Sequence, residues 1–150
     1  MDRRFATVAA AATGVTAVLA LAAPAQAAGR GDGVTEARPT GVGALADYTH
    51  CRHVYKDGVH SGTGCFQSSG DKFLMDDTRA DGLRVVAEWY TDYGRAGECH
   101  MTSGSGGGWA ACDYDMAENG YVKFRVTLRN GADGANQAAT SWSGWLPIGG

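Results

Sequence analysis

Helical periodicity and clustered positive charge are both scarce in this 150-residue sequence. Beyond the N-terminal apolar segment, no stretch repeats apolar residues at the 3.6-residue spacing of an amphipathic helix, which argues against a helical fold. After the first residues, lysine and arginine do not gather in any run. Without such a positive field, nucleic acid and anionic membrane surfaces are poor partners.

The short motifs that mark common catalytic and metal sites are missing as well. The sequence has no nucleophile elbow, no metalloprotease helix motif and no phosphate-binding loop. Its four cysteines do not form the C-x2-C pairs that usually bind zinc. We therefore assign no catalytic residue, no metal ligand and no cofactor from the sequence.

The first residues have the pattern of a secretory signal peptide. Arg3 and Arg4 precede an Ala/Val/Leu-rich run, and the small residues Ala25-Gln26-Ala27 end it. This predicts cleavage after Ala27, so that residues 1–27 are a signal peptide and the protein is secreted to the extracellular space. A membrane anchor is the alternative, but the alanine-rich run has no second apolar segment to accompany it. The mature chain would carry a net charge near −4 and keep about 120 residues, enough for one domain. We expect a monomer that does not bind membranes after cleavage.

All four cysteines lie after the predicted cleavage site, and an even number in an exported chain predicts two disulfides. Of the three possible pairings we favour Cys51 with Cys65 and Cys99 with Cys112. Each of these pairs flanks a turn-rich segment short enough to form one hairpin. In the chain-entropy model, each bridge contributes about 3 kcal/mol to stability.

The mature chain divides into a leader and one domain. Residues 28–46 are rich in glycine, alanine and small polar residues, which predicts a flexible leader. Residues 47–150 have the short strand-like runs and frequent turn residues of a single β domain. The clearest strand is 121–129, where apolar and polar residues alternate, and 83–91 is the second. Further short strands are expected on both sides of the turn Asp57-Gly58 and at 72–76, 98–102, 109–116 and 141–146.

Seven or eight short strands separated by turns predict an all-β fold, an antiparallel sandwich or a small barrel. We expect the stretch 112–116 to form a hairpin with the strand 121–129 across the turn 117–120. The outward side of 121–129 carries a basic stripe of Lys123, Arg125 and Arg129, which acidic residues on a neighbouring strand would match. Residues 130–140 should form turns.

In overall layout the chain resembles the many small secreted actinobacterial proteins, Streptomyces-like, that combine an alanine-rich signal peptide with two disulfides and have no assigned activity. The resemblance covers the whole length and rests on texture. It implies secretion and assigns no functional residue.

Two groups of side chains raise the question of a metal. His50, His53 and His60 lie close to Cys51 in sequence, but His50 and His53 would face opposite ways on a strand. Acidic turns at 76–82 and 113–119 contain oxygen ligands of the kind calcium uses. Turn-forming Asp and Asn residues explain the acidic turns more simply, so we assign no metal site.

The aromatic residues give the best indication of a binding site. Five of them lie near predicted turns or at the chain end, where flat rings can face a sugar or a protein partner. The same rings could instead fill the core, and Trp142 and Trp145 would point to opposite faces if extended. The candidate ligand-binding residues are Tyr90, Tyr93, Trp109, Trp142 and Trp145.

These features favour a non-catalytic extracellular module that binds carbohydrate or another protein. One alternative is a protease inhibitor that uses the glycine-rich loop between Cys99 and Cys112. A small secreted hydrolase is the other, and it would need groups such as Glu88, Glu98 or His100 to converge in a pocket.

Overall fold

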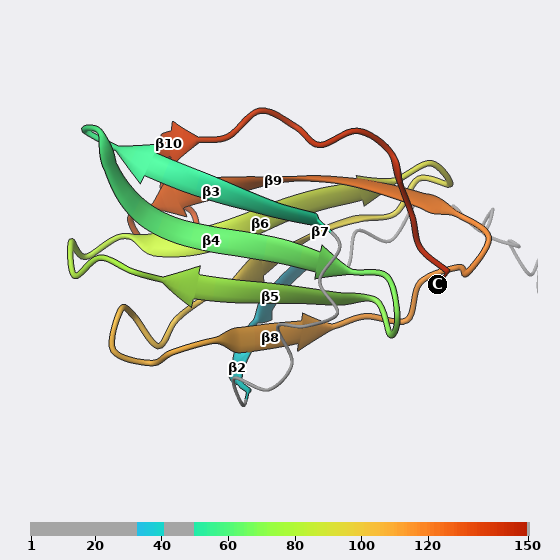
Figure 1. Cartoon of the computed structure of the whole chain (residues 1–150), viewed down its shortest axis with the longest axis horizontal. Coiled ribbons are helices and arrows are strands. Elements are labelled where there is room, and N and C mark those ends of the chain that lie inside the picture. Colours follow the sequence, from blue (N-terminus) through green and yellow to red (C-terminus); the bar gives the residue numbers. More distant parts are fainter. Residues whose placement is uncertain (1–32, 41–49, 150) are drawn as a thin grey trace, which may run out of the picture.

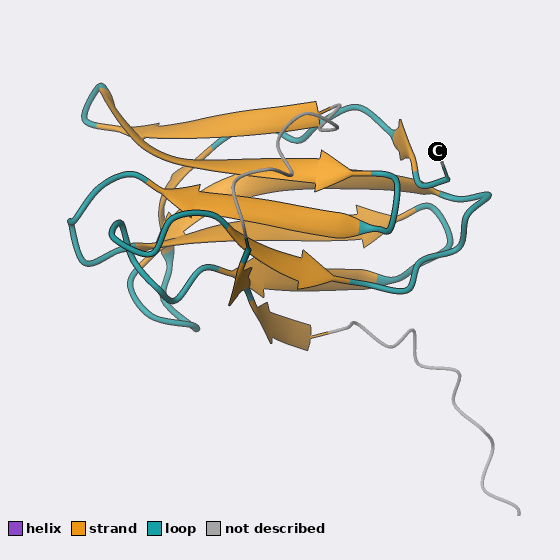
Figure 2. Ribbon diagram, turned by 60° about the horizontal axis from the view of Figure 1, so that its bottom comes forward, coloured by secondary structure: helices purple, strands orange, loops and turns teal. Residues whose placement is uncertain are grey.

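Two β-sheets packed face to face make up the part of the protein that the computed structural model describes, residues 33–40 and 50–149. Figure 1 shows the two layers, and Figure 2 shows that strands and loops account for the fold, with no helix among these residues. The predicted all-β fold is thus confirmed, and because two separate sheets are present it is a sandwich. In these residues no helix is long and apolar enough to cross a membrane.

Sheet A has the order β1-β7-β6-β9-β10, with β11 also paired to β9, and sheet B has the order β2-β8-β5-β4-β3. All strand pairs are antiparallel except β1 with β7. The strands are β1 (Gly33–Glu36), β2 (Arg38–Pro39), β3 (His50–Lys56), β4 (Val59–Gln67), β5 (Lys72–Asp77), β6 (Arg84–Thr91), β7 (Ala96–His100), β8 (Ala110–Asp113), β9 (Tyr121–Arg129), β10 (Asn136–Ala139) and β11 (Leu146–Pro147).

The core lies between the sheets and follows the alternation of the two central strands of sheet A. The apolar residues of β9 and β6 that were predicted to share a face are buried together. From sheet B, Phe73 meets Trp89 and Phe124 at ring-centroid distances of 6.1 and 5.4 Å. Gly64 lets the sheets approach closely, because a Cβ atom there would lie 2.7 Å from Cγ2 of Val126. Burial of one face of each sheet therefore determines the register of the central strands.

Both predicted disulfides are present, but one lies within a hairpin of sheet B and the other joins the two sheets. Cys51 and Cys65 lie opposite each other in the β3–β4 hairpin, whose turn residues Asp57 and Gly58 have φ of 54° and 77°. Cys99 lies on β7 in sheet A and Cys112 on β8 in sheet B. The second bridge therefore joins the two sheets, and its prediction as a hairpin bridge was wrong in that respect.

The hairpin predicted between residues 112–116 and β9 is also wrong. β8 pairs with β5 and β2, and the chain then crosses to sheet A before β9 begins. Tyr114 packs against Trp89 with ring centroids 4.8 Å apart, and the Met116 amide donates to the Asp71 carboxylate at 2.8 Å. Burial of these side chains carries the chain over the end of the sandwich instead of into a tight turn.

The predicted flexible leader 28–46 is wrong for residues 33–40, which hold β1 and β2; its remaining residues and the predicted signal peptide lie outside the described residues. β1 extends sheet A beside β7, and β2 extends sheet B beside β8. Between them, buried Ala37 donates its amide hydrogen to the His100 carbonyl at 2.8 Å. Residues 33–40 therefore form strands because β7 and β8, which lie far away in the sequence, offer them sheet edges to pair with.

Near the C-terminus, the predicted strand 141–146 is wrong except for its last residue, which begins β11. The strand in this region is β10, which falls within residues predicted to form turns. It pairs with β9 through a register shift at Asn136 to Ala138.

Candidate functional site

The outward face of sheet A carries most of the predicted site residues. On β6 the side chains of Val85, Ala87 and Trp89 point into the core, so Arg84, Glu88 and Tyr90 point outward. The register places these three opposite Arg129, Arg125 and Lys123 of β9. Within the basic stripe, Arg125 therefore lies directly opposite an acidic residue of the neighbouring strand, Glu88, as the sequence predicts, whereas Lys123 faces Tyr90.

A network of ion pairs occupies the middle of this face. Glu88 accepts hydrogen bonds from Arg125 Nε at 2.6 Å, from Arg129 Nη2, and from Asn136 Nδ2 at 3.0 Å. Glu98 on β7 accepts from both Nη atoms of Arg129 at 2.8 Å. Arg129 thus bridges the two carboxylates with a planar guanidinium, the geometry that suits paired carboxylates.

His100 extends the network toward the core. Its ring is fully buried, with Nε2 2.8 Å from Glu98 Oε2 and Nδ1 3.4 Å from Arg84 Nη1. Because an arginine can only donate, Nδ1 must accept and Nε2 must carry the hydrogen that Glu98 accepts. The three residues therefore form a directional chain of hydrogen bonds.

These contacts set the protonation state of the two glutamates. Burial on its own raises the pKa of Glu88, but the hydrogen bonds from Arg125, Asn136 and Arg129 outweigh it and the pKa lies below its usual value. Burial likewise raises the pKa of Glu98, and the hydrogen bonds from Arg129 and His100 reverse the shift. Both carboxylates are consequently ionised at neutral pH and act as acceptors.

Beside this network lies an aromatic cluster made of Tyr90, Trp142 and Trp145. The Tyr90 ring contacts Trp142 and Trp145 edge to face, with centroids 4.9 and 5.4 Å apart. Trp142 is 38% exposed and Trp145 is 44% exposed. Arg125 lies 4.9 Å from the centroid of Trp142 and Lys123 lies 4.6 Å from that of Trp145, so cations cap the cluster.

The two tryptophans come to the same side because Ser143 holds the chain between them. The Ser143 amide donates to the Phe124 carbonyl at 2.8 Å, and its hydroxyl accepts from the Phe124 amide at 3.0 Å. Ser143 is buried, while Trp142 and Trp145 lie outside. The expectation that the two rings would face opposite ways is wrong, since residues 141–145 are not an extended strand.

A groove with a volume of about 410 Å³ runs from the aromatic cluster toward β1. Tyr90 and Trp142 border it at one end, and Glu88 and Glu98 contribute carboxylates. The other lining residues come from β1, β6 and β7 and are Gly33, Val34, Trp89, Ala96 and Gly97. A smaller pocket of about 220 Å³, lined by Asp92, Tyr121 and Trp145, lies on the other side of the cluster.

The remaining two predicted aromatic residues lie elsewhere. The Tyr93 hydroxyl accepts from the Ala117 amide at 3.0 Å, which ties it to the loop before β9. Trp109 is half-buried just before β8 of sheet B, where its carbonyl accepts from the Thr40 amide at 2.9 Å. The structure thus brings together three of the five, Tyr90, Trp142 and Trp145.

Of the metal-site alternatives, the histidines come closest to one another. His53 and His60 both contact the Thr63 hydroxyl, at 2.9 and 3.0 Å, and their ring centroids are 5.5 Å apart. Within residues 33–40 and 50–149, no three His, Cys, Asp or Glu side chains are grouped so that they could hold a metal ion.

Sequence reasoning missed the β1 wall of the groove, because β1 was assigned to the leader. The alternation of Val34 and Glu36 with small polar residues is too short to predict a strand.

No protein-family model, curated protein or solved structure matches this chain.

Proposed function

We propose that this protein is a secreted, non-catalytic module that binds carbohydrate on the outward face of sheet A. The observation that carries the proposal is the half-exposed cluster of Tyr90, Trp142 and Trp145 at the end of a groove that contains two ionised carboxylates. Two disulfides support export, since such bridges persist mainly in oxidising compartments.

The groove offers the two kinds of contact that a sugar needs. Exposed aromatic rings present flat apolar surfaces to the C–H face of a pyranose, and they lose little conformational entropy when they do so. Glu88 and Glu98 can accept hydrogen bonds from sugar hydroxyls. A volume of about 410 Å³ is within the range of small-molecule sites.

The protonation states favour binding over hydrolysis. A glycosidase needs one carboxyl group that stays protonated near neutral pH, so its pKa must be raised. In the groove, hydrogen bonds to arginine and histidine lower the pKa of both glutamates. Neither is poised to act as the general acid.

The proposal is tested by glycan-array and insoluble-polysaccharide binding with the mature protein. We expect Trp142→Ala to weaken the binding of any glycan that the protein retains by about tenfold, because an aromatic contact contributes up to about 1.5 kcal/mol beyond the apolar area that it buries. Tyr55→Ala is the matched control, since Tyr55 is an exposed aromatic residue on the other sheet. Absence of any glycan binding, or equal loss in both variants, would contradict the proposal.

A second candidate function is protease inhibition through the loop 102–108. The bridge from Cys99 to Cys112 fixes both ends of this exposed loop to the core. Fixed ends lower the entropic cost of presenting a loop to a protease. A panel of secreted proteases decides the question, and uniform lack of inhibition rejects this candidate.

A further inference from the structure

The edge strand β3 has backbone groups that no other described residue satisfies. β3 pairs only with β4, at the end of sheet B. The Cα atoms of Cys51 and Cys65 are only 4.0 Å apart, which marks a non-hydrogen-bonded pair of an antiparallel ladder. Pairs alternate, so Cys51 and His53 both direct their N–H and C=O groups away from β4, toward the free edge.

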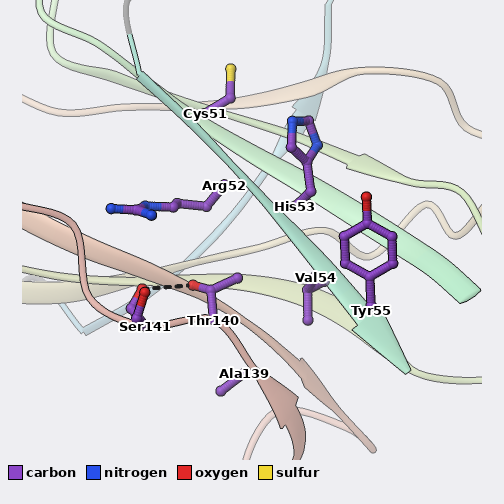
Figure 3. Close-up of a pocket in the computed structure, with 8 residues that line it drawn as sticks. All are labelled: Cys51, Arg52, His53, Val54, Tyr55, Ala139, Thr140 and Ser141. Atoms are coloured by element: carbon purple, nitrogen blue, oxygen red, sulfur yellow. Dashed lines mark hydrogen bonds between the residues drawn. The ribbon is translucent and has the colours of Figure 1, made fainter. Parts of the chain in front are cut away.

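A cleft lies along this free edge. Figure 3 shows it between β3 and the segment of Ala139, Thr140 and Ser141, and its volume is about 440 Å³. A second cavity of about 250 Å³ continues it toward Ser143 and Leu146. Because the side chains of Cys51 and His53 point away from residues 139–141 in Figure 3, it is their backbone that faces the cleft.

Arg52 lines both cavities and is the one lysine or arginine among their lining residues. Its side chain points to the same side of β3 as the buried Val54, toward the interior of the sandwich, and it is half-buried. No ion pair or hydrogen bond joins its guanidinium to any described residue, in contrast to Arg125 and Arg129. Neither cavity is lined by an aspartate or a glutamate.

Arg52 is half-buried and has no anionic partner among the described residues, so the donors of its guanidinium are available to one. A planar, negatively charged group matches the fork of the guanidinium best, which describes a carboxylate. The unpaired backbone groups beside it match another main chain in extended conformation. Both needs are met at once by a peptide strand that carries an acidic side chain.

We propose that the free edge of β3 binds an extended acidic peptide segment of a partner protein. The segment adds a strand next to β3, pairs with the backbone of Cys51 and His53, and places a glutamate or aspartate side chain against Arg52. This site is separate from the aromatic groove, which lies on the outward face of sheet A.

The test uses two capped heptapeptides of serine, threonine and valine that differ only in a central glutamate or glutamine. Nuclear magnetic resonance titration of the mature protein should show shifts of the Cys51 and His53 amides and of Arg52 Nε with the glutamate peptide. The glutamine peptide should bind roughly tenfold more weakly or worse, because a charge-assisted bidentate contact is lost. Strand addition draws its affinity from the main chain, so the absence of amide shifts with both peptides overturns the proposal.

Variants separate the role of Arg52 from that of the edge. Arg52→Gln should bind the two peptides equally, at the weaker affinity. Arg38→Gln, on the opposite edge of sheet B, is the matched control and should discriminate between them as the unmodified protein does. The peptide pair tests the same contact without changing the protein, so the test survives a variant that folds poorly.

One result would assign Arg52 a different role. Inward-pointing charges on edge strands also prevent edge-to-edge aggregation. If Arg52→Gln self-associates and the unmodified protein binds the two peptides equally, Arg52 protects the edge and the proposal is overturned.

Discussion

Glu88 is the residue on which the charge network of sheet A depends. It holds two guanidinium groups and an amide, and its own side chain is nearly buried. Removing its charge leaves Arg125 without a carboxylate and Arg129 with Glu98 alone. Loss of the Glu88 carboxylate therefore breaks two ion pairs at once.

We predict that Glu88→Gln lowers the free energy of unfolding at pH 7 by about 2 kcal/mol, because it leaves partly buried cations with fewer partners. Urea denaturation measures the change. Glu36→Gln is the control, since Glu36 is exposed on the edge strand β1 and should change stability by less than about 0.5 kcal/mol. Equal effects of the two variants would contradict the prediction.

The same variant has a defined pH dependence. The pKa of Glu88 is lower in the folded protein than in the unfolded chain, so its contribution is present above the unfolded value of about 4.3. That contribution is lost as pH falls through the folded pKa and the carboxylate is protonated. The stability difference between the unmodified protein and Glu88→Gln should therefore shrink below about pH 4. A difference that stays constant down to acid unfolding would be inconsistent with the ion pairs.

Asp77 should show the opposite pH dependence. Burial raises its pKa, although the Arg79 amide donates to its carboxylate at 3.0 Å. A raised folded pKa means that stability is lost as pH rises through that pKa, and an asparagine has no such loss. We predict that Asp77→Asn gains stability relative to the unmodified protein between pH 4 and pH 7. Thermal unfolding across this range measures it, and a gap that does not widen would refute the prediction.

At the scale of single elements, what the sequence predicts well is what local chemistry decides. β6 and β9 follow from strict alternation with one buried face, and the β3–β4 hairpin follows from Asp57-Gly58. β1, β2 and β10 escaped prediction because they are ordered by pairing with distant strands. Short polar segments acquire strand structure only when an edge is available.

The candidate site was predictable to a similar extent. The sequence identifies Tyr90, Trp142 and Trp145 as candidate ligand-binding residues, since large rings near turns tend to be exposed. Their convergence was not predictable, because it depends on Ser143 bonding to the backbone of Phe124, a contact between separate segments. Tyr93 and Trp109 have the same local signals and lie elsewhere, so residue type alone does not distinguish them.

The β4 strand offers a comparison of two glycines with different roles. Gly58, in the turn before β4, has φ of 77° and open space around its Cα, so Gly58→Ala costs only backbone strain of about 1 kcal/mol. Gly64→Ala adds a methyl group 2.7 Å from the Val126 side chain and forces the sheets apart locally. We predict a larger loss for Gly64→Ala, about 2–3 kcal/mol. Chemical denaturation of both variants measures this, and a larger loss at Gly58 would contradict the packing argument.

At the scale of the whole molecule, the two disulfides test whether a bridge between the sheets stabilises the fold more than a bridge within a hairpin. Their sequence separations are 14 and 13 residues, so the chain-entropy contributions are equal at about 3 kcal/mol each. Only Cys99 and Cys112 join the two sheets, and both are buried. We predict that replacing this pair with alanine lowers the melting temperature more than replacing Cys51 and Cys65. Calorimetry of the two double variants decides it, and equal losses would show that only loop length matters.

The two sides of the sandwich differ in how their sheet edges end. At one side a single segment crosses at Ala37 and supplies both edge strands, β1 with four residues and β2 with two, the second of which is Pro39. At the other side sheet A ends in β10, which has four residues and a register shift, and sheet B ends in β3, which presents seven residues. Short edges and proline are poor templates for strand pairing, whereas a long edge is a good one. Strand addition at β3 would therefore use the one long edge among the described strands, and the short edges that remain, β1, β2 and β10, are poor templates for propagation into a filament.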